Sequence, residues 1–303
     1  MIAENSDRGW HTPGAELAWS ESVGFRFADP ASRLGVVARL GVHPNEGSVD
    51  VAIDIFMPDG SFVAVRQIGP WRDGVAPLIE GFEIQAVESE DRWRLFCDGA
   101  AHSLPEAAVA DQPAAWKSSR IERVILELEW QACAEPLQSG GGGTRFTQAG
   151  RMRGEMWVSG DHFILDVPAL RDRSWGPRRL ELPESRALLC CLADGEGGFE
   201  IETLRREGES APGTSGWIVI GGEARALSEL ELVEDGEGSA VQGLRASLGL
   251  LDAAKLSREA RVIVMAPLPG RRNDAAFLLR ECFVEWAGEG GTALGFAELL
   301  SRT

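Results

Sequence analysis

The chain lacks tyrosine altogether and contains very little lysine. The absence of tyrosine removes one common general acid from the candidate catalytic groups. Lysine occurs only at Lys117 and Lys255, so arginine supplies nearly all of the 30 basic residues.

Long apolar runs and paired cysteine motifs are also missing. No stretch of 18 apolar residues is present, and the first residues lack a basic region followed by an apolar one, so we expect neither a transmembrane helix nor a signal peptide. The five cysteines are scattered and form no CxxC. This usage predicts buried free thiols in a cytoplasmic protein, without zinc or disulfides.

Nucleotide and nucleophile signatures are absent as well. There is no P-loop, no GxGxxG in a strand-to-helix context and no Gly-x-Ser-x-Gly. The four histidines, His11, His43, His102 and His162, show no metal-ligand spacing. We therefore predict no cofactor and no metal.

Negative charge dominates the 303 residues. The formal net charge is −17 and the pI is about 4.7, so the chain should repel phosphate backbones and anionic lipid. A nucleic acid or a membrane is therefore a poor partner. A small hydrophobic ligand is the expected partner, because closing a small β-barrel encloses space for one; the sequence leaves the oligomeric state open.

Period-two alternation of apolar residues predicts an all-β fold. Val49–Ile55 and Ser61–Ile68 flank the turn Met57-Pro58-Asp59-Gly60 and read as a β-hairpin. Two successive series of short strands suggest two tandem antiparallel β-barrels, which we divide into domains at 1–179 and 180–303. The few helix signals cover Leu104–Ala110, Ala253–Ala260 and Phe296–Ser301.

Gly140–Gly143 is a run of glycines that fits either an interdomain linker or a hairpin loop. We favour the loop, because Ile121–Trp130 and Phe146–Val158 on either side both read as strands that can pair.

The chemically distinctive segment is Arg171-Asp172-Arg173-Ser174-Trp175-Gly176-Pro177-Arg178. In an extended chain Asp172 and Ser174 point one way, and Arg171, Arg173 and Trp175 point the other. The segment thus carries a carboxylate, a large aromatic ring and fixed cations at a strand end.

Two interpretations of this segment remain open. In the structural one, Asp172 pairs with an arginine, Trp175 plugs a barrel end and the segment connects the barrels. In the functional one, Asp172 is an acid or base at an apolar cavity, because burial favours the protonated carboxyl. A contacting arginine would instead make Asp172 an ionised base or a structural anion.

Weaker candidates lie elsewhere and fit packing or surface roles as well as functional ones. They are Glu155, Trp157 and His162 before the segment, Trp19 and Glu21 in the first strand, and Glu298 near the end.

The segments Arg145–Gly154 and Arg171–Arg178 resemble those of uncharacterised bacterial proteins with a Gln-x-Gly…Arg-Asp-His-Ser-Trp-Gly-x-Arg pattern. Those proteins are similar to a double-lipocalin-like superfamily that includes carotenoid hydratases and, more distantly, fungal Diels–Alderases. The resemblance implies two tandem lipocalin-like barrels with few short helices and the motif near their junction. It also implies an aspartate that protonates an alkene, at the position of Asp172.

Arg173 departs from the pattern, which has histidine there. A permanent cation cannot shuttle a proton at neutral pH, so Asp172 would act without that histidine.

Together these observations predict a protein that binds an isoprenoid, polyketide or acyl-like molecule. As an enzyme it would be a cofactor-free hydratase, isomerase or cyclase, with Asp172 as catalytic group and Trp175, Arg173, Arg178 and Trp157 contacting the substrate. Trp175 would shape the cavity and stabilise cationic charge, and Arg178 would orient Asp172 or an anionic group. The alternatives are a non-catalytic lipocalin-like carrier and a structural protein with a solid junction.

Overall fold

A computed structural model describes residues 10–71, 79–87, 89–138, 145–178, 182–193, 197–236, 240–251, 254–272, 275–288 and 291–303. The Gly140–Gly143 run and the predicted boundary between residues 179 and 180 lie outside these residues, so the two-domain division stays a prediction. No helix in the described ranges is long and apolar enough to cross a membrane.

The fold is all-β, as predicted, and its strands form two antiparallel sheets. The strands of the first sheet are β1 (Trp19–Asp29), β2 (Leu34–His43), β3 (Ser48–Phe56), β4 (Phe62–Pro70), β5 (Phe82–Val87), β6 (Ser89–Leu104), β7 (Arg120–Ala132), β8 (Leu137–Gln138), β9 (Arg145–Val158) and β10 (Asp161–Pro177). Its order is β10-β1-β2-β3-β4-β6-β7-β9, and β9 pairs back to β10, so the ladder returns to its start. We call this ring the N-terminal barrel.

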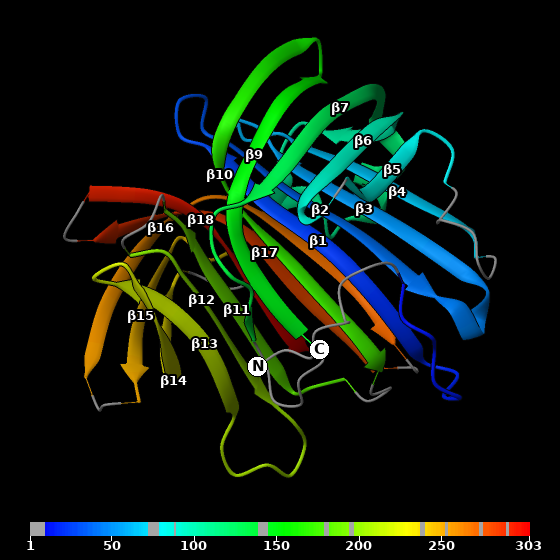
Figure 1. The fold of residues 1–303 in the computed structure, drawn as a ribbon. Helices are drawn as coiled ribbons and strands as arrows, with labels where there is room; N and C mark the ends of the chain where they lie inside the picture. The colour runs from blue at the N-terminus through cyan, green and yellow to red at the C-terminus, as the bar shows by residue number, and fades with distance from the viewer. Residues whose placement is uncertain are drawn as a thin grey trace.

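The second sheet is a closed barrel of consecutive strands. They are β11 (Ser185–Leu192), β12 (Phe199–Arg205), β13 (Gly213–Ile220), β14 (Glu223–Asp235), β15 (Gly243–Leu250), β16 (Lys255–Arg272), β17 (Ala275–Gly288) and β18 (Gly291–Arg302). Figure 1 shows this C-terminal barrel, in olive to red, beside the blue-to-green strands of the N-terminal one.

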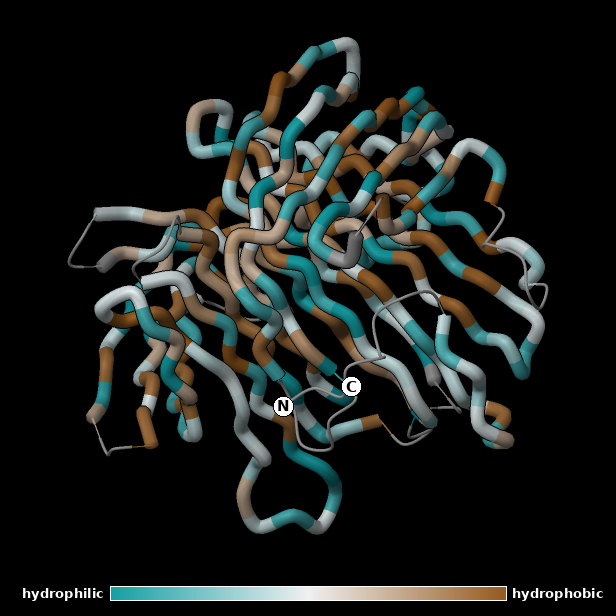
Figure 2. Tube along the Cα trace, viewed as in Figure 1, coloured by the Kyte–Doolittle hydropathy of each residue, from teal (hydrophilic) through white to brown (hydrophobic). Residues whose placement is uncertain are grey.

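Alternation of side chains explains both barrels. Hydropathy changes from residue to residue along many strands (Figure 2). In β3 and β7 buried residues alternate with more exposed ones, as expected for strands that turn one face to a barrel interior. The predicted hairpin exists as β3 and β4, and β7 pairs with β9 across the Gly140–Gly143 run, as predicted.

Helices are short in the described chain: the 3-10 turns η1 (Pro44–Glu46) and η2 (Ala107–Val109), and α1 (Pro113–Ser118). Two predicted helices are wrong, because Lys255–Ala260 lies in β16 and Phe296–Ser301 lies in β18. Lys255–Ala260 pairs with β15 throughout and with β17 at its last two residues, and Phe296–Ser301 pairs with β11 and β17. Hydrogen bonding to these strands outweighs local helix propensity. The first predicted helix survives only as η2, and α1 was not predicted.

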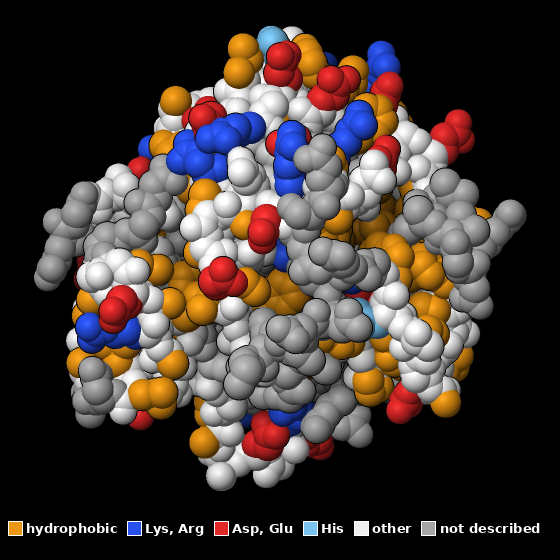
Figure 3. All heavy atoms as spheres, viewed as in Figure 1, with side chains coloured by type: hydrophobic (Ala, Val, Ile, Leu, Met, Phe, Trp, Pro, Cys, Tyr) orange, Lys and Arg blue, Asp and Glu red, His pale blue; other side chains and the backbone are white. Residues whose placement is uncertain are grey.

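A third apolar cluster joins the outer faces of the two barrels, a region that we call the junction. It includes Phe56 and Phe62 from the N-terminal barrel and Phe283 and Phe296 from the C-terminal one. Four of the five free cysteines are buried as expected, whereas Cys133 is exposed. Acidic and basic side chains are interspersed on the face shown in Figure 3.

Candidate functional site

The distinctive segment lies at the end of β10, between β1 and β9. Asp172 is paired with Gly24 on one side and Thr147 on the other. The predicted alternation is observed: Arg171 and Arg173 are buried inside the N-terminal barrel, while Asp172 faces the junction. The segment therefore contributes to two different environments.

Inside the barrel, Arg173 binds Glu21 of β1. Its Nε lies 3.0 Å from Glu21 Oε1, and its Nη2 contacts the same oxygen. Burial alone would raise the pKa of Glu21, but hydrogen bonds from His11 and the charge of Arg173 outweigh it and hold the pKa below its ordinary value. Glu21 is thus a carboxylate in the folded protein.

His11 joins this pair from the segment before β1. Its backbone N donates to Glu21 Oε2 at 2.8 Å, and its Nδ1 lies 2.9 Å from Glu21 Oε1. The imidazole stacks on Trp175, with 4.3 Å between ring centroids and 9° between planes. Because an ionised carboxylate only accepts hydrogen bonds, Nδ1 carries the hydrogen and Nε2 keeps its lone pair in the neutral ring.

The free nitrogen of His11 is the chemically informative atom. His11 Nε2 is buried and has no hydrogen-bond partner in the described part of the chain. A histidine held by a carboxylate through one nitrogen and open at the other has the arrangement of a general base. Neither His11 nor its approach to Trp175 was predicted from the sequence.

Aromatic rings enclose the two inward arginines. The Arg171 guanidinium lies 5.0 Å from the ring centroid of Trp93 and 5.1 Å from those of Trp130 and Phe146. The Phe146 and Trp175 centroids are 6.2 Å apart. We call Trp93, Trp130, Phe146 and Trp175 the aromatic enclosure; its ring faces stabilise cationic charge.

On the junction face, Asp172 pairs with Arg26 of β1. Arg26 Nη1 donates to Asp172 Oδ1 at 2.8 Å, and Arg26 Nε donates to Glu298 Oε1 of β18 at 3.2 Å. Asp172 therefore serves as an anion that helps to hold a buried arginine between the barrels. This contact matches the structural interpretation of Asp172 or an ionised base more closely than an acid.

Arg178 binds serine hydroxyls on β1 and β10, with 2.6 Å from Nε to Ser20 Oγ and 2.8 Å from Nη2 to Ser174 Oγ. Its predicted role in orienting Asp172 or an anionic group stays a prediction. Ser22 Oγ completes this group, 3.0 Å from Ser174 Oγ. Arg26, which is distant in sequence and was not predicted, contacts Asp172 directly.

Trp157 lies far from the other predicted residues. It is paired with His162 at the opposite end of β10, and the two rings stack with centroids 4.7 Å apart. At roughly 3.3 Å per residue, positions 162 and 172 are separated by about 33 Å. Asp172, Arg173, Trp175 and Arg178 therefore lie in one segment but on two faces of β10, and Trp157 lies far from all four.

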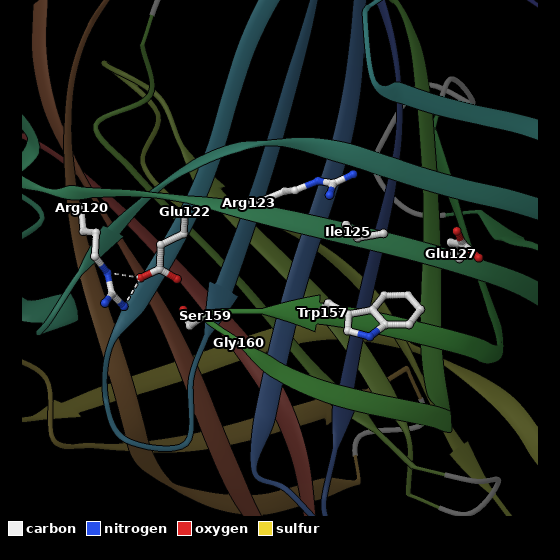
Figure 4. Close-up of a pocket in the computed structure, with 8 residues that line it drawn as sticks. All are labelled: Arg120, Glu122, Arg123, Ile125, Glu127, Trp157, Ser159 and Gly160. Carbon is white, nitrogen blue, oxygen red and sulfur yellow. Dashed lines mark hydrogen bonds and ion pairs between the residues drawn. The ribbon is translucent and has the colours of Figure 1, made fainter.

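Trp157 instead lines an open groove of about 620 Å³ on the outer face of β7 and β9. In Figure 4, Trp157 lies with Ile125 and Glu127, while Arg120 and Glu122 pair farther along the groove. Charged residues of both signs surround this small apolar floor. In the described residues no group of three or more His, Cys, Asp or Glu is placed to hold a metal ion.

One family model matches almost the entire chain. It covers residues 4–303 and is described as a domain of unknown function, DUF7064. The chain belongs to the DUF7064 family. No functionally curated protein matches it significantly.

Solved structures share the fold at low identity. A Nitrosomonas europaea protein assigned to AttH is 11% identical with a TM-score of 0.67, over 100% of this chain and 99% of that one. CghA in complex with Sch210972 is 11% identical with a TM-score of 0.59, over 94% and 89% of the chains. Kievitone hydratase from Nectria haematococca is 11% identical with a TM-score of 0.54, over 96% and 90%. At this identity these likenesses show the fold alone, here two lipocalin-like barrels.

The sequence contains a signal for the role of Glu21, which is a carboxyl group at a core position of a strand. Period-two alternation puts it on the same face of β1 as Val23 and Phe25, so a carboxyl group occupies a core position. Arg171 and Arg173 are the matching charged residues on the inward face of β10. A buried charge without a partner is costly, so these residues had to meet one another or another polar group.

Proposed function

We propose that this DUF7064 protein binds an apolar small molecule at the end of the N-terminal barrel and moves a proton on it without a cofactor. The ligand class is isoprenoid, polyketide or acyl-like, and the reaction is a hydration, isomerisation or cyclisation. The observation that carries the proposal is the Glu21–His11 pair, with a buried and available Nε2 beside Trp175.

His11 is the proton-transfer group in this mechanism. In an isomerisation or cyclisation, Nε2 takes a proton from a ligand carbon or hydroxyl and returns it to another ligand atom. In a hydration, cationic His11 gives its proton to an alkene carbon and then takes one from the water that adds. Either cycle leaves the protein unchanged, with no net gain or loss of protons.

The surrounding residues support the charged states of this cycle. The Glu21 carboxylate stabilises the imidazolium and fixes its orientation, and Arg173 keeps Glu21 ionised. Trp175 stacks on the imidazole, so its π-face stabilises the cation. Arg173 thus contributes by positioning Glu21, while a histidine from another segment supplies the proton chemistry.

Asp172 remains the rival catalytic group. Its ion pair with Arg26 favours a role as an ionised base at the junction, where a ligand would lie between the barrels. The two assignments differ in which face of β10 meets the ligand, so substitutions on the two faces separate them.

A non-catalytic lipocalin-like carrier is the second candidate. The observation in its favour is that Glu21 and Arg173 are completely buried and satisfy one another, as a structural ion pair would. A carrier would retain ligand without changing it.

The test begins with the compounds that copurify with the full-length protein, extracted and identified by mass spectrometry. Fresh protein is incubated with the extract in D₂O, and deuterium entering the ligand or product is measured. We expect wild type to transfer deuterium and His11→Gln to be about 10²–10⁴-fold slower, as for loss of a general acid–base group.

His43→Gln is the matched control, because His43 also pairs with a carboxylate, Asp50, but lies on the outer face of β2, opposite the inward-facing Val42. It should transfer deuterium at the wild-type rate. Equal rates for wild type and His11→Gln would remove His11 from the mechanism, and retention of ligand without any transfer would identify a carrier.

A further inference from the structure

The indole of Trp130 holds a buried donor that lacks an acceptor. Trp130 lies on β7, is completely buried inside the N-terminal barrel and has no hydrogen-bond partner for Nε1 in the described ranges. Its ring covers Gly150 of β9 so closely that a Cβ there would lie 2.5 Å from Trp130 Cε2. The ring position is therefore built into the barrel.

The C-terminal barrel contains a matching tryptophan whose donor is satisfied. Trp286 is 2% exposed and covers Gly295, where a Cβ would lie 2.7 Å from its Nε1. Trp286 Nε1 donates to the Cys190 carbonyl at 2.8 Å. Trp217 at the junction likewise donates to Thr147 Oγ1 at 2.8 Å. A buried donor without a partner is costly, so the difference at Trp130 requires an explanation.

Trp130 belongs to the aromatic enclosure that leads to His11. The Arg171 guanidinium lies 5.1 Å from both the Trp130 and Phe146 ring centroids. Phe146 packs edge-on against Trp175, and Trp175 stacks on His11. This series of contacts thus has a buried donor without a partner at Trp130, a buried ring nitrogen without a partner at His11 and the Arg171 cation between them.

We propose that the ligand of the N-terminal barrel is an apolar molecule with a carbonyl oxygen that accepts the Trp130 Nε1 hydrogen. This inference rests on the proposed function and specifies its substrate class: an oxygenated ligand such as a ketone or enone, not a pure hydrocarbon. The Arg171 guanidinium favours the partial negative charge of a carbonyl oxygen at this end. The proton-transfer position then lies toward His11, away from the carbonyl anchor.

Two matched variants test the donor without any ligand. Trp130→Phe and Trp286→Phe each remove an indole N–H from a ring packed on a glycine. We expect Trp286→Phe to lower the urea midpoint more than Trp130→Phe, because only Trp286 loses a hydrogen bond within the protein. Equal losses would mean that Trp130 Nε1 has a protein acceptor, which overturns the proposal.

Titration with 2-nonanone and nonane tests the ligand class on the full chain. In ¹H–¹⁵N spectra the Trp130 indole signal is the one missing from Trp130→Phe. We expect 2-nonanone, but not nonane, to shift it downfield. Trp130→Phe should bind 2-nonanone about tenfold more weakly, while its affinity for nonane is unchanged.

Two other results of the titration would contradict the proposed carbonyl ligand. An indole signal insensitive to both compounds, as expected if water alone accepts the bond, contradicts the proposal, as does equal binding of 2-nonanone to both proteins. None of these readouts depends on turnover. A ketone-specific response combined with normal deuterium transfer in His11→Gln would therefore reject the catalytic role of His11 and keep the ligand class.

Discussion

At the scale of single residues, the site depends on charged groups in core positions. Glu21, Arg171 and Arg173 are all at most 1% exposed, and each lies on an inward strand face. Arg173 occupies the place where the resemblance expects histidine, and the histidine beside Trp175 is His11. Proton chemistry is thus available without a histidine in the motif itself.

Replacing Asp172 tests which face of β10 carries the chemistry. Asp172→Asn removes one of the two carboxylates that bind Arg26, leaving Glu298 as the other. We expect the free energy of unfolding to fall by about 1–3 kcal/mol, because a buried arginine loses a charge-assisted hydrogen bond. Urea unfolding monitored by circular dichroism measures this loss.

Deuterium transfer by the folded fraction of Asp172→Asn should stay within about tenfold of wild type, because the substitution leaves His11 and Glu21 in place. Unchanged stability together with abolished transfer would instead identify Asp172 as the catalytic group.

The sequence predicted part of this site, and the reason for the rest is physical. Alternation along β10 predicted which side chains share a face, because that depends only on strand geometry. The partners of those side chains depend on register and on chain segments far away. Arg26 contacts Asp172, and His11 contacts Glu21, only because the fold brings distant segments together. The Trp10–Gly14 segment has no periodic pattern from which its position could be predicted.

At the scale of elements, long strands with two different faces build both barrels and the junction. β1 and β10 turn one face into the N-terminal barrel and present Arg26, Asp172 and Ser174 on the other. The helix predictions at Ala253–Ala260 and Phe296–Ser301 were wrong because they used only the helix propensity of the local residues. Hydrogen bonding to neighbouring strands determines the structure there.

The contact of β2 with β17 gives a direct test of junction packing. A Cβ at Gly35 would lie 2.7 Å from Cδ2 of Phe283, a completely buried ring. Gly35→Ala should therefore lower the free energy of unfolding by about 1–3 kcal/mol through overpacking, as measured by urea unfolding.

Gly213→Ala is the control for this substitution. Gly213 begins β13, and the nearest atom to a Cβ there is 3.9 Å away. We expect little change in stability, and a Gly35→Ala protein as stable as the Gly213→Ala protein would show that the β2–β17 contact is loose.

At the scale of the whole molecule, a network of buried and partly buried ionic groups, together with the apolar cluster, joins the barrels. The carboxyls are Asp54, Asp172, Glu200, Glu202, Glu281 and Glu298, and the arginines are Arg26, Arg66, Arg145 and Arg186. Carboxyls outnumber arginines, so full ionisation would leave excess negative charge between the barrels. Burial, together with the charges of Asp54 and Glu298, accordingly raises the pKa of Glu281 well above its ordinary value.

This charge balance predicts that stability falls as pH rises through mildly acidic values. Burial raises the pKa of Glu200 to about 6 from 4.5, so the folded state binds its proton more tightly than the unfolded state does. The stabilisation is fully present below pH 4.5 and is lost as pH rises through about 6, on the order of 1–2 kcal/mol. Urea unfolding at several pH values measures it.

Glu200→Gln should flatten this decline, because glutamine does not titrate. Glu202→Gln, on the same strand, should leave it in place, since Arg186 and Arg145 outweigh burial and lower the pKa of Glu202. A wild-type stability that rises between pH 4.5 and 6 would contradict the assignment. At lower pH Glu298 has the opposite effect. Its pKa is lowered to about 2, so its contribution to the free energy of unfolding is lost as pH falls below 4.5.

The central claim is that proton transfer takes place inside the N-terminal barrel at His11. The most direct measurement compares deuterium transfer to the copurified ligand by His11→Gln and Asp172→Asn under identical conditions. The account predicts a rate about 10²–10⁴-fold below wild type for His11→Gln and one within about tenfold of wild type for Asp172→Asn. The reverse order of rates would contradict it and move the chemistry to the junction.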